Sequence, residues 1–399
     1  MESFKQKKIL ILAGASVHLK LVEAAKELGC HTIVTDYLDS SPAKDIADES
    51  WLLNISDVEG IVTRCREEHV DGIITGWIDP CQRPYWEICL KLGLPCLGTE
   101  EQFFRMTDKH AFKEMCITND VNVIPEYTVD ECIDNPTVFP VFVKPVDSRG
   151  SRGQNVCNNL TELKKAIIDA KSESSNDDIL IEKYMAECQE FQLTYFYVNG
   201  TPYLVRTVDS YTGTAEDKMD KVTVCSLSPS SVTDSYIKNA HDKVIAMFNN
   251  LGIQNGPIFM QGFEDNGEFY FFDPGLRFPG VDYERIYKKV FGIDLMKLMV
   301  AYSLTGSLPD IELPKDGYDL NGNKVVILFP TLTAGQVGII EGLDKLSCDD
   351  AVVSVLPRCN VGDKITWSFN VNQRLAEIDI LLEPSFEISE FINRVQTSY

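Results

Sequence analysis

The sequence predicts an α/β protein of several domains, including lobes of the α+β kind, and three observations support this. The chain has 399 residues, more than one hydrophobic core usually serves, and 44% of them are hydrophobic. Over the first hundred residues, short apolar runs alternate with amphipathic segments, as in a parallel sheet covered by helices. Further along, apolar runs joined by Asn-Gly predict antiparallel hairpins.

Charge and cysteine content limit the partners and the compartment. The chain has 37 basic and 60 acidic residues, a net charge of −23, so we expect neither nucleic acid nor an anionic membrane as a partner. The twelve cysteines form no Cys-x-x-Cys pair, and the N-terminus leads directly into a strand without a recognisable signal peptide. This combination predicts reduced thiols in a cytoplasmic protein. No apolar run approaches the roughly 20 residues of a membrane-spanning helix.

The first hundred residues predict a doubly wound parallel sheet. The expected strands are Lys8–Ala13, His31–Thr35 and Gly72–Thr75, and the expected helices are Val17–Leu28, Ser56–Glu68 (from a capping box at Ser56) and Gln82–Leu92. Ligands of such sheets bind beyond the carboxyl ends of the strands, which makes His18 and Asp79 candidates for substrate contact. Solvated loop residues are the alternative. The turn at Gly14 lacks the Gly-x-Gly-x-x-Gly spacing of a dinucleotide site.

A strand, a lysine and a loop of small residues follow one another in the middle of the chain. The strand Phe139–Val143 places Lys144 at its end, and a second strand returns after the loop. Glycines let backbone N–H groups turn towards phosphate oxygens, and serines add hydroxyl donors. The loop residues with these properties are Ser148, Gly150, Ser151 and Gly153. We therefore predict a phosphate-binding flap, with a solvated hairpin as the alternative.

A further strand, Asp178–Ile181, leads into the segment Glu182-Lys183-Tyr184-Met185, with Glu190 eight residues after Glu182. A strand that runs on into an extended link can offer backbone donors and acceptors to the edge of an adenine ring. In this interpretation Glu182 binds the exocyclic amine of adenine and Glu190 accepts from ribose hydroxyls.

A hairpin over residues 256–280 ends in a group of unusual composition. Two apolar runs, Pro257–Phe263 and Glu268–Phe272, are joined by Glu-Asp-Asn-Gly, a strong hairpin signal. The second run continues into Asp273 and, four residues later, Arg277. A buried strand that delivers an acid and an arginine predicts a binding site, and an exposed Asp–Arg pair is the alternative.

Together these segments resemble the ATP-grasp superfamily. The resemblance rests on Lys109 in MTDKHAFKEM, Lys144 in FVKP, the SRGSRGQNV loop, EKYM with Glu190, and DPGLR, found in the family's order over essentially the whole chain. It is greatest for the branch that contains biotin carboxylase, the carbamoyl-phosphate synthase large chain, and the carboxylate–amine and amino-acid ligases.

The resemblance implies a plan of four parts. These are a Rossmann-like domain (1–105), a small lobe with linking helices and the flap (106–184), a large lobe with a metal site (185–320) and a β-rich C-terminal extension (321–399). Five short runs, Lys324–Phe329, Gln336–Glu341, Ala351–Leu356, Lys364–Asn370 and Ala376–Leu382, predict a small antiparallel sheet or barrel in the extension. The usual role of this extension is packing, with a contact in a homodimer as the alternative.

The resemblance also implies the ligands, with ATP held between the two lobes. Lys109 and Lys144 would contact its phosphates, and the flap would close over them. Glu182, Lys183, Tyr184 and Met185 would border the adenine, with Glu190 at the ribose. Asp273 would bind Mg²⁺, for which Mn²⁺ could substitute. Arg277 would hold the transferring phosphoryl group or the acceptor carboxylate.

Two residues depart from the family's metal site. The first metal carboxylate usually stands twelve residues before the second, and that position is Gln261. The residue two after Asp273, commonly Asn, is Gly275. Since an amide oxygen can coordinate Mg²⁺ and phosphates supply further ligands, we expect a weaker metal site rather than none.

The expected activity is that of an ATP-dependent ligase. It would phosphorylate a small carboxylic acid to an acyl-phosphate and join it to an amine or amino acid, releasing ADP and phosphate. One alternative is a bicarbonate-phosphorylating carboxylase or carbamoyl-phosphate synthase-like enzyme. Another is an ATP-binding protein whose catalysis has decayed, for which Gln261 and Gly275 are the support.

Overall fold

The N-terminal part contains the expected parallel sheet. The computed structural model describes residues 4–146, 153–174, 177–185, 188–213, 222–281, 283–366 and 373–386. Four parallel strands lie in the order β3-β2-β1-β4, with bounds Lys8–Leu12 (β1), His31–Asp36 (β2), Glu49–Leu52 (β3) and Gly72–Ile74 (β4). The helices of this part are α1 (Leu19–Glu27), α2 (Pro42–Ile46), α3 (Val58–Glu68) and α4 (Gln82–Leu92).

Local sequence explains where several helices begin. Asp57, and not Ser56 as predicted, caps α3, since its side chain accepts the N–H of Gly60. The next helix, α5 (Glu100–Arg105), starts with a true capping box in which Thr99 and Gln102 bond each other's backbone N–H. Asp108 caps α6 (Lys109–Thr118), which places Lys109 in its first turn.

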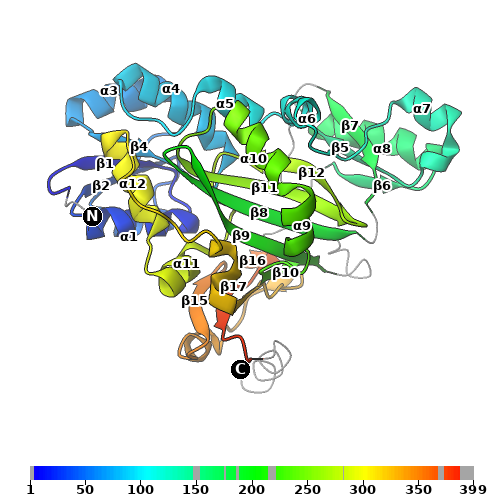
Figure 1. Cartoon of the computed structure of the whole chain (residues 1–399). Coiled ribbons are helices and arrows are strands. Elements are labelled where there is room, and N and C mark those ends of the chain that lie inside the picture. Colours follow the sequence, from blue (N-terminus) through cyan, green and yellow to red (C-terminus); the bar gives the residue numbers. More distant parts are fainter. Residues whose placement is uncertain are drawn as a thin grey trace.

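The small lobe extends to one side of the molecule (Figure 1). Its three antiparallel strands lie in the order β6-β5-β7, with bounds Val141–Pro145 (β5), Asn155–Cys157 (β6) and Ile179–Lys183 (β7). Helix α8 (Leu160–Glu173) packs its buried residues Leu163, Ala166 and Ala170 against this sheet, and α7 (Val129–Asp134) precedes it. The flap residues Ser148, Gly150 and Ser151 lie outside the described residues, whereas Gly153 is described.

The large lobe is built on a sheet of eight strands in the order β12-β11-β8-β9-β10-β13-β17-β15. Its first five strands are β8 (Gln189–Val198), β9 (Thr201–Thr212), β10 (Thr223–Ser228), β11 (Gly256–Asp265) and β12 (Glu268–Gly275). The Asn-Gly turns between β8 and β9 and between β11 and β12 are confirmed as hairpins. The amphipathic pattern over Thr233–Leu251 predicts one helix that ends at Gly252. The structure has two helices there, α9 (Thr233–Asn239) and α10 (His241–Asn250), because the backbone leaves helical geometry at Ala240.

The C-terminal strands correct one expectation. Strands β13 (Lys324–Leu328), β15 (Val352–Pro357) and β17 (Ala376–Leu382) are antiparallel as predicted, but they continue the large sheet from β10 and form no sheet of their own. Only β14 (Gly335–Gln336) and β16 (Lys364–Ile365) pair separately among the described residues. The reason is that apolar side chains of β13 face two cores, so this strand is central rather than peripheral.

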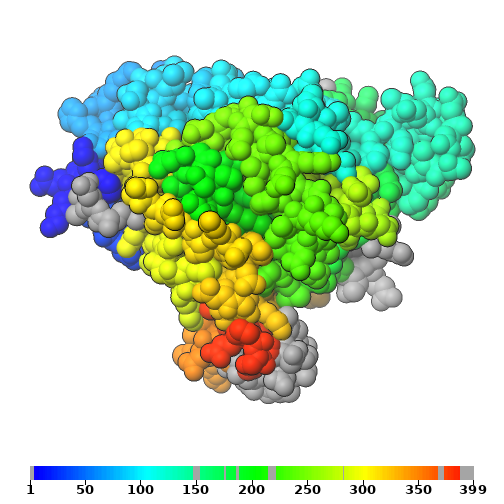
Figure 2. Space-filling view, viewed as in Figure 1, coloured from blue at the N-terminus to red at the C-terminus, as the bar shows by residue number. Residues whose placement is uncertain are grey.

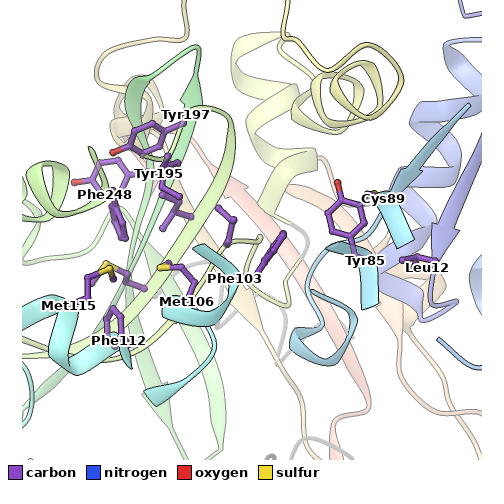
Figure 3. Close-up of a cluster of buried hydrophobic side chains, with 14 of the residues drawn as sticks. Leu12, Tyr85, Cys89, Phe103, Met106, Phe112, Met115, Tyr195, Tyr197 and Phe248 are labelled. Carbon is purple, nitrogen blue, oxygen red and sulfur yellow. The ribbon is translucent and has the colours of Figure 1, made fainter. Parts of the chain in front are cut away.

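The two faces of the large sheet bury different cores. Odd-numbered residues of β8, such as Tyr195 and Tyr197, pack with Phe248 of α10 and with α5 and α6 (Figure 3). That core continues to Tyr85 and Cys89 of α4, so the N-terminal part and the large lobe share it. The opposite face packs against α1, α11 (Tyr283–Phe291) and α12 (Leu295–Thr305). In the space-filling view, the N-terminal part and the large lobe form one continuous body (Figure 2).

Candidate functional site

A row of three polar side chains crosses the large sheet where the metal site was expected. Gln192 of β8 stands directly opposite Gln261 of β11, which in turn stands opposite Asp273 of β12. Directly paired residues point to the same face of a sheet, so the three side chains are neighbours. The hairpin thus brings together Gln261 and Asp273, which are twelve residues apart in the chain.

Asp273 is a buried carboxyl with charged groups of both signs close to it. Burial raises the pKa of its carboxyl and the neighbouring Asp79 adds to this, whereas Arg277, Lys109 and Lys144 act in the opposite direction. Lys109 therefore lies close enough to influence the predicted metal carboxylate. Among the described residues, no three His, Cys, Asp or Glu side chains form a group able to hold a metal. A site here would depend on Asp273, the amide oxygen of Gln261, and oxygens from phosphate and water, which is a donor set that Mg²⁺ accepts.

Glu190 lies beside this row. The amide of Gln261 donates to its Oε1 over 3.4 Å, and Gln192 does so over 3.5 Å. With its nitrogen turned to Glu190, the amide of Gln261 directs its oxygen away from that carboxylate. Burial raises the pKa of Glu190, and the contact with Gln192 offsets this only in part. The contact of Glu190 with a ribose stays a prediction.

The most enclosed charges of the site belong to a lysine–glutamate–lysine group. Glu182 of β7 is 1% exposed, and its two oxygens contact different lysines. Lys144 of β5 lies 2.7 Å from Oε2, and Lys113 of α6 lies 2.5 Å from Oε1. Burial alone would raise the pKa of Glu182, but the charges of Lys144 and Lys113 outweigh it and hold the pKa below its usual value.

This arrangement bears on the predicted role of Glu182. Both of its oxygens are engaged by lysines, so binding an adenine amine would require sharing one of them. Lys113 is held further by Glu126 and by the carbonyl of Ile124 at 3.3 Å. The contact of Glu182 with adenine stays a prediction, and its observed contacts are those that fix the position of Lys144.

The segment predicted to link to adenine begins inside β7, which includes Glu182 and Lys183, and Tyr184 and Met185 follow the strand. The backbone N–H of Lys183 donates to the carbonyl of Pro125, and its side chain approaches Asp265 at 3.5 Å. Tyr184 stacks on Phe142 of β5 with ring centroids 6.4 Å apart. Met185 is buried. The structure therefore brings this segment beside the hairpin of β11 and β12, while its contact with a nucleotide is a proposal.

The edge of the flap is closely packed. Gly153 has φ +69°, a conformation that favours glycine, and a Cβ there would stand 2.9 Å from Pro145 and 3.1 Å from Glu173. Lys144 also lies over the ring of Phe272, at 5.5 Å from its centroid. The chain on both sides of the flap is thus anchored near the lysine that was predicted to bind phosphate.

Arg277 links the large lobe to the N-terminal part. Its Nε donates to Oδ1 of Asp79 over 2.5 Å and its Nη2 to Oδ2 over 2.9 Å, so the pair is bidentate. The departure at Gly275 has a steric reason, because a Cβ there would stand 2.9 Å from Cγ of Arg277. The sequence proposed Asp79 and Arg277 separately, and the fold brings them into contact.

The second predicted loop residue, His18, is an interior residue. It is fully buried, meets Trp77 edge to face at 5.4 Å, and burial lowers its pKa to about 4. Trp77 has φ +60°, which is uncommon for a bulky side chain, and it stacks on Phe278 beside Arg277. A neutral His18 therefore supports the wall of aromatic rings next to the Arg277–Asp79 pair.

Two residues of this site escaped the sequence analysis. Lys113 lies one helical turn after Lys109 on α6, and this i, i+4 spacing was a signal that both lysines share one face. Gln192 lies two residues after Glu190 on β8, a spacing that puts both on one face of the sheet. Within the described part of the chain, no helix is long and apolar enough to cross a membrane.

Comparison with known proteins yields one family and relatives of several activities. Residues 137–280 match the family described as ATP-grasp domain. Formate-dependent phosphoribosylglycinamide formyltransferase of Prochlorococcus marinus (strain MIT 9515) is 24% identical over 281 residues, which cover 66% of this chain and 70% of the relative.

Two solved structures are similar over nearly the whole chain. An L-amino acid ligase from Bacillus licheniformis has a TM-score of 0.77 at 18% identity, covering 99% of this chain and 98% of the ligase. The biotin carboxylase domain of 2-oxoglutarate carboxylase from Hydrogenobacter thermophilus was solved with MgADP, ADP and bicarbonate. It has a TM-score of 0.75 at 18% identity, and the match covers 95% of this chain and 86% of that chain. At these identities the likeness shows the fold alone.

Proposed function

Since this protein carries an ATP-grasp domain over residues 137–280, we propose that it is an ATP-dependent ligase that joins a carboxylic acid to an amine. The acid would be phosphorylated by ATP to an acyl-phosphate, and an amine or amino acid would then displace the phosphate. ADP and phosphate are the other products. The observation that supports this most is that Lys144 of the small lobe lies close enough to Asp273, at the end of β12, to act on its carboxyl together with Arg277.

The chemistry requires charge neutralisation more than proton transfer. A carboxylate and a phosphoryl group repel each other, so cationic groups must hold them in line. Lys109 and Lys144 would bind phosphate oxygens, and Arg277 would hold the phosphoryl group or the acid. Lys113 acts through Glu182 and positions Lys144. Mg²⁺, held by Asp273 and Gln261, would supply further charge neutralisation on the phosphates; Mn²⁺ could replace it.

The remaining assignments follow from the same proposal. The nucleotide would lie between the small lobe and the large lobe, with Lys183, Tyr184 and Met185 along the adenine and Glu190 at the ribose. The flap residues Ser148, Gly150, Ser151 and Gly153 would cover the phosphates. We divide the chain at residues 105, 184 and 320, with the C-terminal part extending the sheet of the large lobe.

The test is an assay of ADP release with ATP, Mg²⁺ and a broad panel of acids and amines, with bicarbonate as a separate arm. We expect release of ADP and phosphate only when a matching acid and amine are both present. Stimulation by bicarbonate without an amine would instead favour a carboxylase-type enzyme. Tight binding of ATP in calorimetry, with no stimulation by any member of the panel, would contradict a ligase and indicate a binding protein.

A further inference from the structure

An arginine with unused hydrogen-bonding groups lies inside the large lobe. Arg206 of β9 is 1% exposed, and among the described residues none of its three guanidinium nitrogens has a hydrogen-bond partner. Its guanidinium lies over the ring of Tyr283 of α11, 5.0 Å from the centroid. Arg206 belongs to none of the groups assigned above.

Burying a guanidinium without hydrogen-bond acceptors destabilises the folded protein unless a ligand supplies the acceptors. A guanidinium stays charged in proteins and presents five N–H donors in one plane. Buried donors without acceptors destabilise a fold, whereas buried polar groups in native proteins are nearly always paired. An unpaired guanidinium therefore indicates a site prepared for acceptors that come from elsewhere.

Nearby carboxylates act on Arg206 electrostatically but form no hydrogen bond with it. Glu284, Glu377 and Asp379 each raise the pKa of Arg206 electrostatically, and burial outweighs them, so that the pKa is lowered. Each of the three has a closer partner. Glu284 pairs with Lys20, Glu377 with Arg358, and Asp379 accepts from Ser354.

The register of the sheet sets Arg206 on the face that carries the predicted reaction centre, three strands from Asp273 in the order β12-β11-β8-β9. It stands directly opposite Thr194 of β8, whose hydroxyl is also buried and, among the described residues, without a hydrogen-bond partner. Thr194 is two residues from Gln192, so its side chain shares the face of the Gln192–Gln261–Asp273 row. On its other side Thr194 faces Phe259, over whose ring Arg277 lies at 5.1 Å.

We propose that Arg206 and Thr194 form a binding subsite for a substrate carboxylate that does not react. A carboxylate matches the planar fork of a guanidinium and can accept from the Thr194 hydroxyl as well. The substrate would then be an amino acid or a dicarboxylic acid, with its reacting end towards Asp273 and Arg277. That the ligand is a substrate rests on the proposed function, whereas the subsite itself does not.

The first experiment compares the thermal unfolding of Arg206→Met with that of the wild type without ligand. If Arg206 is kept unpaired for a ligand, an apolar side chain of similar length stabilises the empty protein, and we expect the Tm to rise by about 2 °C or more. The matched control is Arg64→Met, because Arg64 lies over Trp51 and pairs with Glu49, so its loss should not raise the Tm. A lower Tm for Arg206→Met would mean a structural role and would overturn the subsite.

The second experiment measures the Tm shift on adding dicarboxylates and L-amino acids, each compared with its amide. In the wild type we expect the carboxylates and not the amides to raise the Tm, and in Arg206→Met we expect this shift to disappear. A shift that persists in the variant overturns the subsite. If the wild type shows the Arg206-dependent shift but never releases ADP, the subsite stands and the proposed function fails.

In a protein with measurable turnover, the KM for the carboxylate substrate is the third readout. We expect Arg206→Met to raise it about 30-fold or more, the scale of losing one partner of a buried charged hydrogen bond. Arg206→Lys keeps the charge but not the fork, and we expect an intermediate KM. A KM equal to that of the wild type in both variants overturns the subsite.

Discussion

Lys144 and Glu182 form a buried ion pair across two adjacent strands of the small lobe, with Nζ 2.7 Å from Oε2. The second oxygen of Glu182 binds Lys113 from α6, at 2.5 Å. Lys109 lies one turn before Lys113 on that helix and acts on Asp273 of the large lobe. Helix α6 therefore connects the charges of the two lobes between which the nucleotide is proposed to bind.

Lys144→Ala should lower turnover by about 10²-fold or more, the scale of losing a preorganised charge stabiliser. The measurement is kcat for ADP release at saturating substrates. Lys165→Ala, an exposed lysine on α8 of the same lobe, is the matched control and should behave as the wild type. Turnover of Lys144→Ala within a factor of two or so of the control would remove Lys144 from the phosphate site.

Glu182→Gln should destabilise the protein by about 3–5 kcal/mol at neutral pH, because two buried lysines lose their shared counter-charge. The measurement is urea unfolding of the variant and of Glu173→Gln, an exposed control on α8.

The loss of unfolding free energy in Glu182→Gln should depend on pH. The pKa of Glu182 is lower in the folded protein than its usual 4.5, so its contribution is fully present above pH 4.5 and is lost as the pH falls through the folded value. The difference in unfolding free energy between wild type and Glu182→Gln should therefore shrink in acid. A constant difference would show that ionised Glu182 is not its source.

Gln261→Glu should tighten Mg²⁺ binding, since a carboxylate replaces an amide opposite Asp273. Without the metal the same change should lower the Tm, because the new charge would lie near both Asp273 and Glu190. Calorimetry of Mg²⁺ binding in the presence of ADP gives the affinity, and Gln192→Glu, in the next position of the row, is the comparison. Equal Mg²⁺ affinity in wild type and Gln261→Glu would place Gln261 away from the metal.

Arg277→Lys should lower kcat by about tenfold or more, because an ammonium cannot reproduce the planar, bidentate contacts of a guanidinium. The control is Arg83→Lys, since Arg83 is an exposed residue of α4 that pairs with Glu87. The measurement is kcat of both variants by steady-state kinetics. A near-normal kcat in Arg277→Lys would mean that Arg277 only stabilises the fold and does not act in turnover.

Much of the fold was predictable because its signals are local. The alternation of strands and helices in the first hundred residues, and the Asn-Gly hairpins, follow from patterns within short windows of sequence. The division of residues 233–251 into two helices was missed, because an unbroken amphipathic pattern gives no sign of the backbone change at Ala240. The C-terminal strands β13, β15 and β17 were identified, whereas the expected strand Gln336–Glu341 is a strand only at Gln336. The union of β13, β15 and β17 with the large sheet depends on pairing between β10 and β13, far apart in the chain.

The sequence by itself determined the residue types of the candidate site: the lysines, the acid and the arginine at strand or helix ends, and the hairpin that sets Gln261 opposite Asp273. Only the tertiary structure decided their partners. Lys113 binds Glu182 and Asp79 binds Arg277, and both are contacts between distant segments. The burial of Arg206 without a hydrogen-bond partner among the described residues likewise depends on the elements packed around it. Local pattern specifies which face of an element is buried, whereas the electrostatic environment of a buried charge depends on which elements pack against it.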